Sequence, residues 1–170
     1  CGYNIAQFTF ELNSDGQSYA LVGVNETYFL GGDVILPDRY NGMPVTKLGD
    51  ELFNYCDLVT SIVIPDTITI IEEGVASFCQ NLTSVYIGKN VSYIGYYSFK
   101  ESPKLASIEV DSRNVMYKSL DGNLYTKDGK TLLMYAPGRP DVAFIIPEGV
   151  TTIDVEAVIL CTNLVSIVYP

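Results

Sequence analysis

The sequence of 170 residues contains no histidine and no tryptophan. The absence of histidine excludes Ser-His-Asp and Cys-His catalysis and every metal site that needs an imidazole ligand. There is also no glycine-rich loop of the kind that cradles phosphate, because the 14 glycines are scattered or mark turns. We therefore expect no enzymatic activity, no cofactor and no metal site.

Cationic residues are also scarce: 10 Lys and Arg stand against 20 Asp and Glu, a net charge of −10. Nucleic acid and anionic membrane surfaces attract clustered Lys and Arg, so neither is an expected partner. No run approaches the roughly 18 apolar residues of a transmembrane helix. Only residues 100–139 are locally basic, with 7 basic and 5 acidic residues that include Lys118, Lys127 and Lys130. This segment is either a solvated loop or a docking patch.

Short apolar segments recur at a fixed spacing along the chain. Six of them end on an equivalent apolar residue, and these residues are separated by 28, 23, 23, 36 and 23 positions. The six residues are Leu36, Ile64, Ile87, Val110, Ile146 and Tyr169. A period in the twenties with an L-x-x-L-x-L core is typical of a leucine-rich solenoid.

The rest of each period repeats as well. A second apolar pair follows each strand, as in Ile68/Ile71, and a short segment that ends in a thiol or small polar residue completes the unit, as in residues 75–79. One coil would consist of a strand, a turn, a second extended piece and a helix of one or two turns. Because no coil buries its apolar residues alone, the coils must stack. The sequence predicts an α/β repeat solenoid, a right-handed leucine-rich-repeat stack of coils of about 23 residues.

Two pairs of adjacent carboxylates, Asp50-Glu51 and Glu72-Glu73, are the remaining candidates for acid–base chemistry. Such pairs could in principle serve a glycosidase. Both pairs, however, come directly before a segment that the repeat predicts to be helical. Since acidic residues stabilise the N-terminus of a helix, we assign them that structural role.

The repeat unit closely resembles the Treponema-type (BspA-like) leucine-rich repeat family of bacterial surface proteins. The resemblance covers roughly residues 19–170 and depends most on residues 59–79 and 82–102, together with an interruption of the family type at residues 114–128. It implies a secreted or cell-surface protein with adhesive or protein-binding roles, and no enzyme. Cys1-Gly2 either is the lipid-modified start of a bacterial lipoprotein or is simply where this sequence begins. The implied localisation is extracellular or at the bacterial cell surface.

Cys56 and Cys79 lie 23 residues apart at one coil position. Stacked coils would place them about 4.8 Å apart, within reach of a disulfide. Both side chains would nevertheless point inward, where free cysteine behaves as a small buried hydrophobe. We expect both thiols to be reduced and buried, and we expect Phe78 to turn inward and fill the space that Ala76 leaves.

Two regions depart from the simple stack. Residues 3–24 alternate apolar and polar around Asp15-Gly16, which predicts a β-hairpin that caps the first coil. We assign residues 1–32 to this cap and residues 33–170 to one continuous solenoid. The 36-residue interval holds 13 extra residues, and its apolar pieces and Asp-Gly turns predict short antiparallel strands in an inserted excursion over about residues 111–143. Excursions from repeat arrays often lie on the binding side, so this one is a candidate side wall.

One residue of each strand stands between two core-facing residues and points to the outer, concave face of the sheet. These outward residues are Ile35, Val63, Tyr86, Glu109, Ile145 and Val168. Five of the six are apolar or aromatic, which reflects either β-propensity alone or a protein-contacting stripe. We predict that the row binds a protein or peptide in adhesion, with Lys118, Lys127 and Lys130 beside it. Two alternatives remain: a glycan-binding module that uses Tyr93, Tyr96 and Tyr97, or a structural spacer between surface modules.

Overall fold

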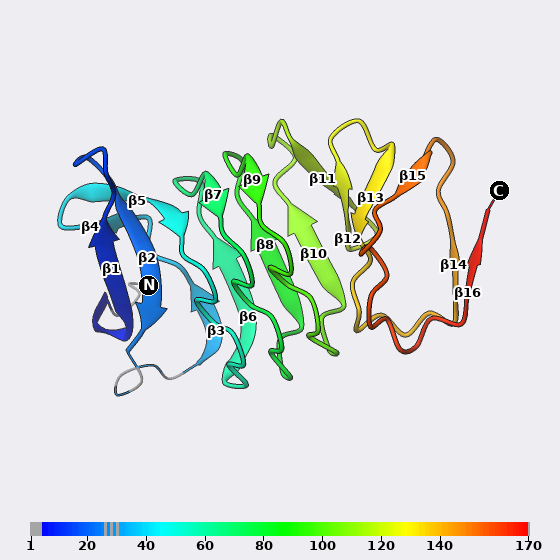
Figure 1. Ribbon diagram of the computed structural model, residues 1–170, viewed down its shortest axis with the longest axis horizontal. Helices are drawn as coiled ribbons and strands as arrows, with labels where there is room; N and C mark the ends of the chain where they lie inside the picture. Colours follow the sequence, from blue (N-terminus) through cyan, green and yellow to red (C-terminus); the bar gives the residue numbers. More distant parts are fainter. Residues whose placement is uncertain (1–4, 26, 28, 30, 170) are drawn as a thin grey trace.

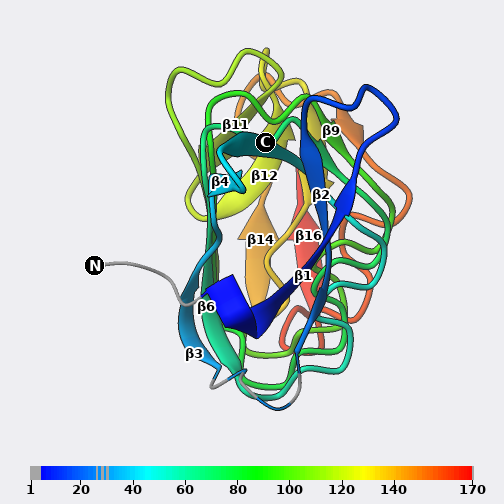
Figure 2. The ribbon, with the colours of Figure 1, turned by 90° about the vertical axis from the view of Figure 1, so that its left-hand side faces the viewer.

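The computed structural model describes residues 5–25, 27, 29 and 31–169. Cys1, the residue of the lipid-anchor alternative, lies outside the described residues. The described chain forms 16 strands and one short 3₁₀ helix, Ile5–Gln7. Its coils lie side by side along the longest axis of the molecule, with the N-terminal hairpin at one end and the last coil at the other (Figure 1). Viewed along that axis, successive coils lie one behind another (Figure 2).

The first four coils each contribute one strand to a parallel sheet, which we call the front sheet. Its strands are β3 (Gly32–Ile35), β6 (Val59–Ile64), β8 (Ser84–Ile87) and β10 (Ser107–Val110). The register pairs residues one period apart, so that Ile64 lies beside Ile87. Both side chains are fully buried, which confirms the predicted inward register. Of the six equivalent repeat residues, Tyr169 alone is not buried: it lies in the last described coil and is 73% exposed.

A second sheet follows the next corner of the coils and includes the N-terminal hairpin. Its strands are β1 (Phe8–Leu12), β2 (Tyr19–Val24), β5 (Met43–Leu48), β7 (Ile70–Ile71) and β9 (Tyr93–Ile94), with β4 (Arg39–Tyr40) paired to β5. The antiparallel β1–β2 pair is the predicted hairpin, and β2 continues into the coils by pairing in parallel with β5. Phe8 and Leu21 of the hairpin belong to the same core as the coils. The division into a cap over residues 1–32 and a solenoid over residues 33–170 stays a prediction.

The α/β label is wrong, because the described residues contain no α-helix. The segments predicted as helical are turns whose amides bond to the neighbouring coil. Glu51 donates its N–H to the carbonyl of Glu73 at 2.9 Å, and Phe53 donates to Val75 at 2.7 Å. These amides are therefore not available to a helical ladder. Left-handed residues such as Glu51 (φ 55°) and Tyr55 (φ 58°) also break a right-handed helix. The chain is a β-solenoid of about 6 coils of about 23 residues.

The acidic pairs consequently do not sit at helix N-termini. Asp50 accepts the backbone N–H of Glu73, one period later, at 3.1 Å. Asp57 and Asp66 of the same coil accept the amides of the residues 23 positions after them at 3.0 and 3.1 Å. Three aspartates of one coil thus satisfy amides at the corners of the next coil.

Cys56 and Cys79 are free, as predicted, but only Cys79 is also buried. Burial raises the pKa of the Cys79 thiol to about 12, whereas Cys56 is only partly buried. The prediction for Phe78 is wrong. Its backbone is left-handed (φ 58°), and its ring stacks on that of Tyr55, with 4.6 Å between centroids, at the edge of the coil.

The predicted excursion is an antiparallel meander of three strands. These are β11 (Tyr117–Leu120), β12 (Asn123–Thr126) and β13 (Thr131–Met134), and β13 pairs in parallel with β15 (Thr152–Ile153). The strands β14 (Ala143–Ile145) and β16 (Ser166–Val168) form a separate parallel pair. The meander therefore separates the front sheet from the last strand pair, and the buried apolar residues fall into two clusters.

Asn114 begins the diversion. It stands 23 residues after the core residue Val91, and it is fully buried in a rung that is otherwise apolar. Its Nδ2 donates to the carbonyls of Gly88 (3.1 Å) and Val91 (2.9 Å), and its Oδ1 accepts the amides of Met116 and Tyr117, both at 2.8 Å. The side-chain amide can donate two hydrogen bonds and accept two, and all four are made. Asn114 therefore satisfies backbone groups at the end of one coil and at the start of the meander.

Truncation of Ile87 tests the stack. Ile87→Ala removes a fully buried side chain from the middle of the core, so we expect the free energy of unfolding to fall by about 2–5 kcal/mol in urea denaturation. The matched control is Val155→Ala at a side chain that is 90% exposed, where we expect a change within about 0.5 kcal/mol. Equal effects of the two substitutions would contradict the inward register.

Replacement of Asn114 by leucine tests the diversion point. Asn114→Leu keeps the apolar character of the rung but leaves buried backbone groups without partners, which costs about 1–3 kcal/mol for each group. Asn90→Leu is the control, because Asn90 is exposed and donates only one bond, to the carbonyl of Asp66. A variant at position 114 as stable as the wild type in thermal unfolding would show that the amide is dispensable.

Candidate functional site

The outer face of the front sheet carries four of the predicted outward residues in one line. Ile35, Val63, Tyr86 and Glu109 are direct partners across β3, β6, β8 and β10. Ile35 is 52% exposed and Tyr86 is 39% exposed. Val63 is partly buried and Glu109 is exposed. We call these four residues the outer row.

A polar line borders the outer row on the same face. It consists of Asp33, Ser61, Ser84 and Ser107, each two residues before a member of the row. The hydroxyl of Ser61 donates to Asp33 at 2.7 Å, as does that of Thr60 at 3.0 Å, and these bonds lower the pKa of Asp33. An apolar strip with a polar border has the composition of a protein-contacting surface.

The other two predicted residues, Ile145 and Val168, do not continue this line. They are partners of each other on β14 and β16, and both are exposed. Between them and the outer row stands the meander, whose Gly122 carbonyl accepts the N–H of Ile108 on β10 at 2.8 Å. The row of six is therefore divided into a group of four and a group of two.

The predicted lysines all lie on the meander, but their surroundings differ. Lys127 donates to the carbonyl of Ser112 at 2.9 Å, in the loop that follows β10. The end of the Lys118 side chain lies against the Gly129 turn. Lys130 follows that turn and is exposed. Only Lys127 therefore reaches the loop beside the outer row.

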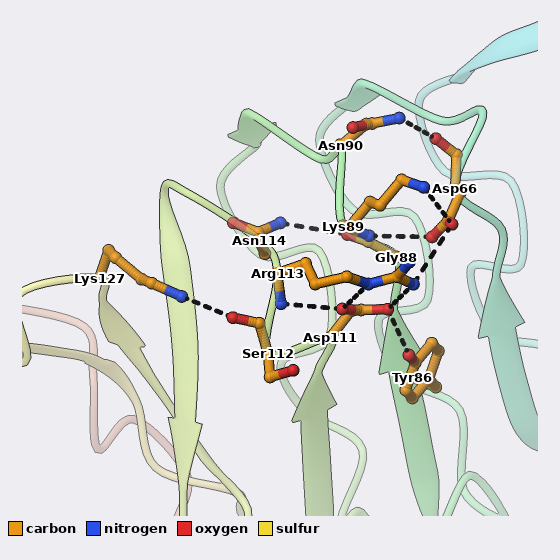
Figure 3. A network of polar contacts seen from close by, with 10 residues as sticks. All are labelled: Asp66, Tyr86, Gly88, Lys89, Asn90, Asp111, Ser112, Arg113, Asn114 and Lys127. Carbon is orange, nitrogen blue, oxygen red and sulfur yellow. Dashed lines mark hydrogen bonds and ion pairs between the residues drawn. The ribbon is translucent and has the colours of Figure 1, made fainter.

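A network of charged and polar side chains stands at the ends of β8 and β10, directly beside Tyr86 (Figure 3). The Tyr86 hydroxyl donates to Asp111 Oδ2 at 3.0 Å. Arg113 binds the same carboxylate through two nitrogens, Nε at 2.9 Å and Nη2 at 2.6 Å. Arg113 also lies 3.6 Å from Asp66, which pairs with Lys89 at 3.0 Å. We call these five residues the polar network.

The electrostatics of the polar network fix its protonation. The hydrogen bonds from Arg113 hold the pKa of Asp111 well below its ordinary range, and the Lys89 amide lowers that of Asp66. Partial burial and the bond to Asp111 raise the pKa of Tyr86. At neutral pH Asp111 and Asp66 are therefore ionised, and Tyr86 is neutral.

The sequence did not lead us to predict a site at Arg113, Asp111, Asp66 and Lys89. A signal was present, because Asp66 and Lys89 are opposite charges separated by one period of 23 residues. Residues one period apart are neighbours on adjacent coils, so a charge pair at that spacing predicts an ion pair. Arg113 had no such signal, since it pairs within its own turn.

The three tyrosines of the glycan alternative lie elsewhere. Tyr93, Tyr96 and Tyr97 are 45%, 63% and 42% exposed and occupy β9 and the turn after it. They line a groove of about 430 Å³ between this coil and the meander.

The described ranges contain neither a candidate metal site nor a membrane-spanning helix. No three or more Cys, Asp or Glu residues there are placed to hold a metal ion. No helix in those ranges is long and apolar enough to cross a membrane.

The chain is similar to known leucine-rich repeat proteins. Residues 42–125 match the family model described as "BspA type Leucine rich repeat region (6 copies)". No curated protein matches the chain.

Solved structures to which the chain is similar include a leucine-rich repeat protein from Bacteroides ovatus (24% identity, 99% of this chain and 41% of that one, TM-score 0.66). Others are a leucine-rich repeat protein from Eubacterium ventriosum (15%, 95% and 59%, 0.49) and a leucine-rich cell surface protein from Faecalibacterium prausnitzii (19%, 97% and 72%, 0.41). The first of these shows that the fold is a leucine-rich repeat solenoid. The chain spans less than two thirds of the length of the first two.

Substitution of Asp111 tests the polar network through pH. The pKa of Asp111 is depressed in the folded state, so its ion pair stabilises the protein above the unfolded pKa of about 3.9 and is lost as the pH falls toward the lower folded value. We expect Asp111→Asn to be less stable than the wild type at neutral pH, and the difference to shrink in acid. Urea unfolding between about pH 7 and pH 2 measures this, and a constant difference would contradict the assignment.

Proposed function

Because its repeat region belongs to the BspA-type leucine-rich repeat family, we propose that this chain is a non-enzymatic binding module that holds another protein through the outer row. The similar solved chains are longer than the part that this chain matches. Any activity of the whole protein is therefore also a proposal. The partner is an extracellular protein, and the contact serves adhesion.

The observation that carries the proposal is the fixed position of Tyr86. Its ring is 39% exposed near the middle of the outer row, while its hydroxyl is held by Asp111. A ring that is already oriented loses little conformational freedom when a partner covers it. Central tyrosines of this kind dominate the binding energy of many interfaces.

Arg113 extends this anchor. Its guanidinium is held by the Asp111 carboxylate, yet its side chain is 63% exposed. Arginine and tyrosine are the residue types enriched among dominant interface residues. Lys89 and Lys127 add positive charge at the same end of the sheet, and Glu109 and Asp33 add negative charge along it. The surface therefore suits a partner that offers an apolar strip between charges of both signs.

The localisation in this proposal is extracellular or at the bacterial cell surface, with lipid attachment at Cys1 as one mode of anchoring. Support comes from the family of the repeats. Binding of the partner does not depend on how the chain is anchored, because the outer row belongs to the folded coils.

A structural spacer is the second candidate function. The stacking of the coils favours it, because strands of neighbouring coils pair in parallel, from β3 to β10 and again between β14 and β16. A spacer would hold other modules apart through this stack, and substitutions in the outer row would then have no effect on assembly.

Truncation of Tyr86 tests the proposal. We expect Tyr86→Ala to weaken binding to a protein ligand by about 2 kcal/mol, roughly thirtyfold. The ligand is first identified by surface plasmon resonance against a panel of extracellular-matrix proteins. Tyr86→Phe retains the ring and loses the bond to Asp111, so it should weaken binding less than Tyr86→Ala.

The matched control is Tyr55→Ala, because Tyr55 is 68% exposed on another edge of the coil. This substitution should leave the affinity unchanged. Wild-type affinity in Tyr86→Ala, or an equal loss in Tyr55→Ala, would remove the outer row as the binding surface.

A further inference from the structure

The meander creates a second surface that the outer row does not use. In the second sheet, β9 is the last strand in order, and the strands of the meander pair with each other and with β15 instead of with β9. Between β9 with its following turn and the meander lies the groove of about 430 Å³. Its volume falls within the range of roughly 300–1,000 Å³ that is typical of small-molecule sites. The insertion therefore produces a groove at the point where the regular stack is interrupted.

The groove has an apolar floor and an aromatic rim. Phe99, Leu124 and Met134 are buried and line it. Tyr93, Tyr96 and Met116 stand at the rim and are 45%, 63% and 48% exposed. Aromatic rings attract the weakly positive C–H groups of a ligand to their faces, because the face of the ring is electron-rich.

Polar groups are available at the same rim. The hydroxyls of Tyr93 and Tyr96 have no hydrogen-bond partner among the residues that the structure describes, and Asp154 uses only its Oδ1 there, to accept the amide of Glu156 at 3.1 Å. Tyr97 is held by Glu156 at 3.2 Å, and the same carboxylate pairs with Lys100 at 2.6 Å. The rim thus combines fixed and free polar groups with exposed rings.

A peptide strand would not fit the open edge of β9. Such a strand needs free backbone groups on the sheet edge. The Tyr117 hydroxyl instead lies on this edge, where it donates to the carbonyl of Ser92 at 3.4 Å. The ring of Tyr117 therefore occupies the place of an added strand.

Charge narrows the ligand class further. The ionised groups that line the groove are Lys100 and Asp154, and Lys100 is already paired with Glu156. The groove consequently offers no free cation to an acidic ligand, and the chain as a whole carries a charge of −10. Neutral ligands that have both C–H faces and many hydroxyls match the rings, the free tyrosine hydroxyls and the carboxylate. Oligosaccharides of neutral sugars have this chemistry.

We propose that this groove binds a neutral oligosaccharide. One pyranose ring stacks on Tyr96, and sugar hydroxyls bond to the hydroxyl of Tyr93 and to the carboxylate of Asp154. The site is independent of the outer row, so the chain can hold a protein and a glycan on different faces.

The test uses a panel of neutral hexasaccharides, namely α-1,4-glucan, β-1,4-glucan, β-1,4-mannan and β-1,4-galactan, titrated against the intact chain by isothermal calorimetry. We expect at least one to bind, and Tyr96→Ala to weaken that binding about tenfold. Tyr96→Ala should not disturb folding, because its side chain is 63% exposed, and an unchanged melting temperature verifies this. Tyr93→Phe, which removes only the hydroxyl, should also weaken binding.

Two tyrosines outside the groove serve as matched controls, and Tyr55→Ala and Tyr86→Ala should both bind the sugar as the wild type does. Loss of sugar binding in Tyr86→Ala would place the sugar on the outer row and overturn the proposal. It is equally overturned if no hexasaccharide binds at millimolar concentration, or if Tyr96→Ala binds as tightly as the wild type. A peptide panel that binds only when Tyr96 is intact, with no sugar bound, would assign the groove to peptides instead.

Discussion

Hydrogen bonding between residues one period apart is the constraint on which this structure depends. Backbone and aspartate bonds link each coil to the next at nearly every corner, so side chains at one coil position form a line along the stack. The coils also approach each other so closely that some positions have room only for glycine. A Cβ at Gly88 would lie 2.8 Å from the Pro65 carbonyl, and one at Gly95 would lie 2.7 Å from the Glu72 carbonyl carbon. The outer row is a line of this kind, and the coil period sets its spacing.

The meander matters because it breaks this regularity at one place. Asn114 places a satisfied amide in an apolar rung, and the chain leaves the stack there without exposing unpaired backbone groups. The interruption ends the front sheet at β10 and brings Lys127 to the loop after that strand. It also opens the groove beside β9. The outer row is thus a product of the regular stack, whereas the groove is a consequence of the insertion.

The repeat period of the sequence predicts which side chains are buried in the stack, but it does not predict the backbone of the return segments or most of the polar contacts. The spacing of apolar residues predicted the burial of Ile64 and Ile87 correctly, because apolar side chains at one coil position must face the core. The alternation of apolar and polar residues likewise predicted the hairpin. The return segments were predicted as helices because Tyr55 and Phe78 do not by residue type signal a left-handed backbone. The Tyr86–Asp111 bond of the polar network was not predicted for a different reason. It joins residues on adjacent coils that are 25 positions apart, which is not the period of 23. The pairing of Asp66 with Lys89, one period apart, could have been found.

The central claim is that the stack holds the outer row on one face for a protein partner. Its most direct test is nuclear magnetic resonance of the isotopically labelled chain during titration with a confirmed protein ligand. If the outer row binds the partner, chemical shift changes will concentrate at Val63, Tyr86 and Glu109 and extend to Arg113, on one face of the front sheet. Changes centred on the stacked pair of Tyr55 and Phe78, with the front sheet unaffected, would contradict it.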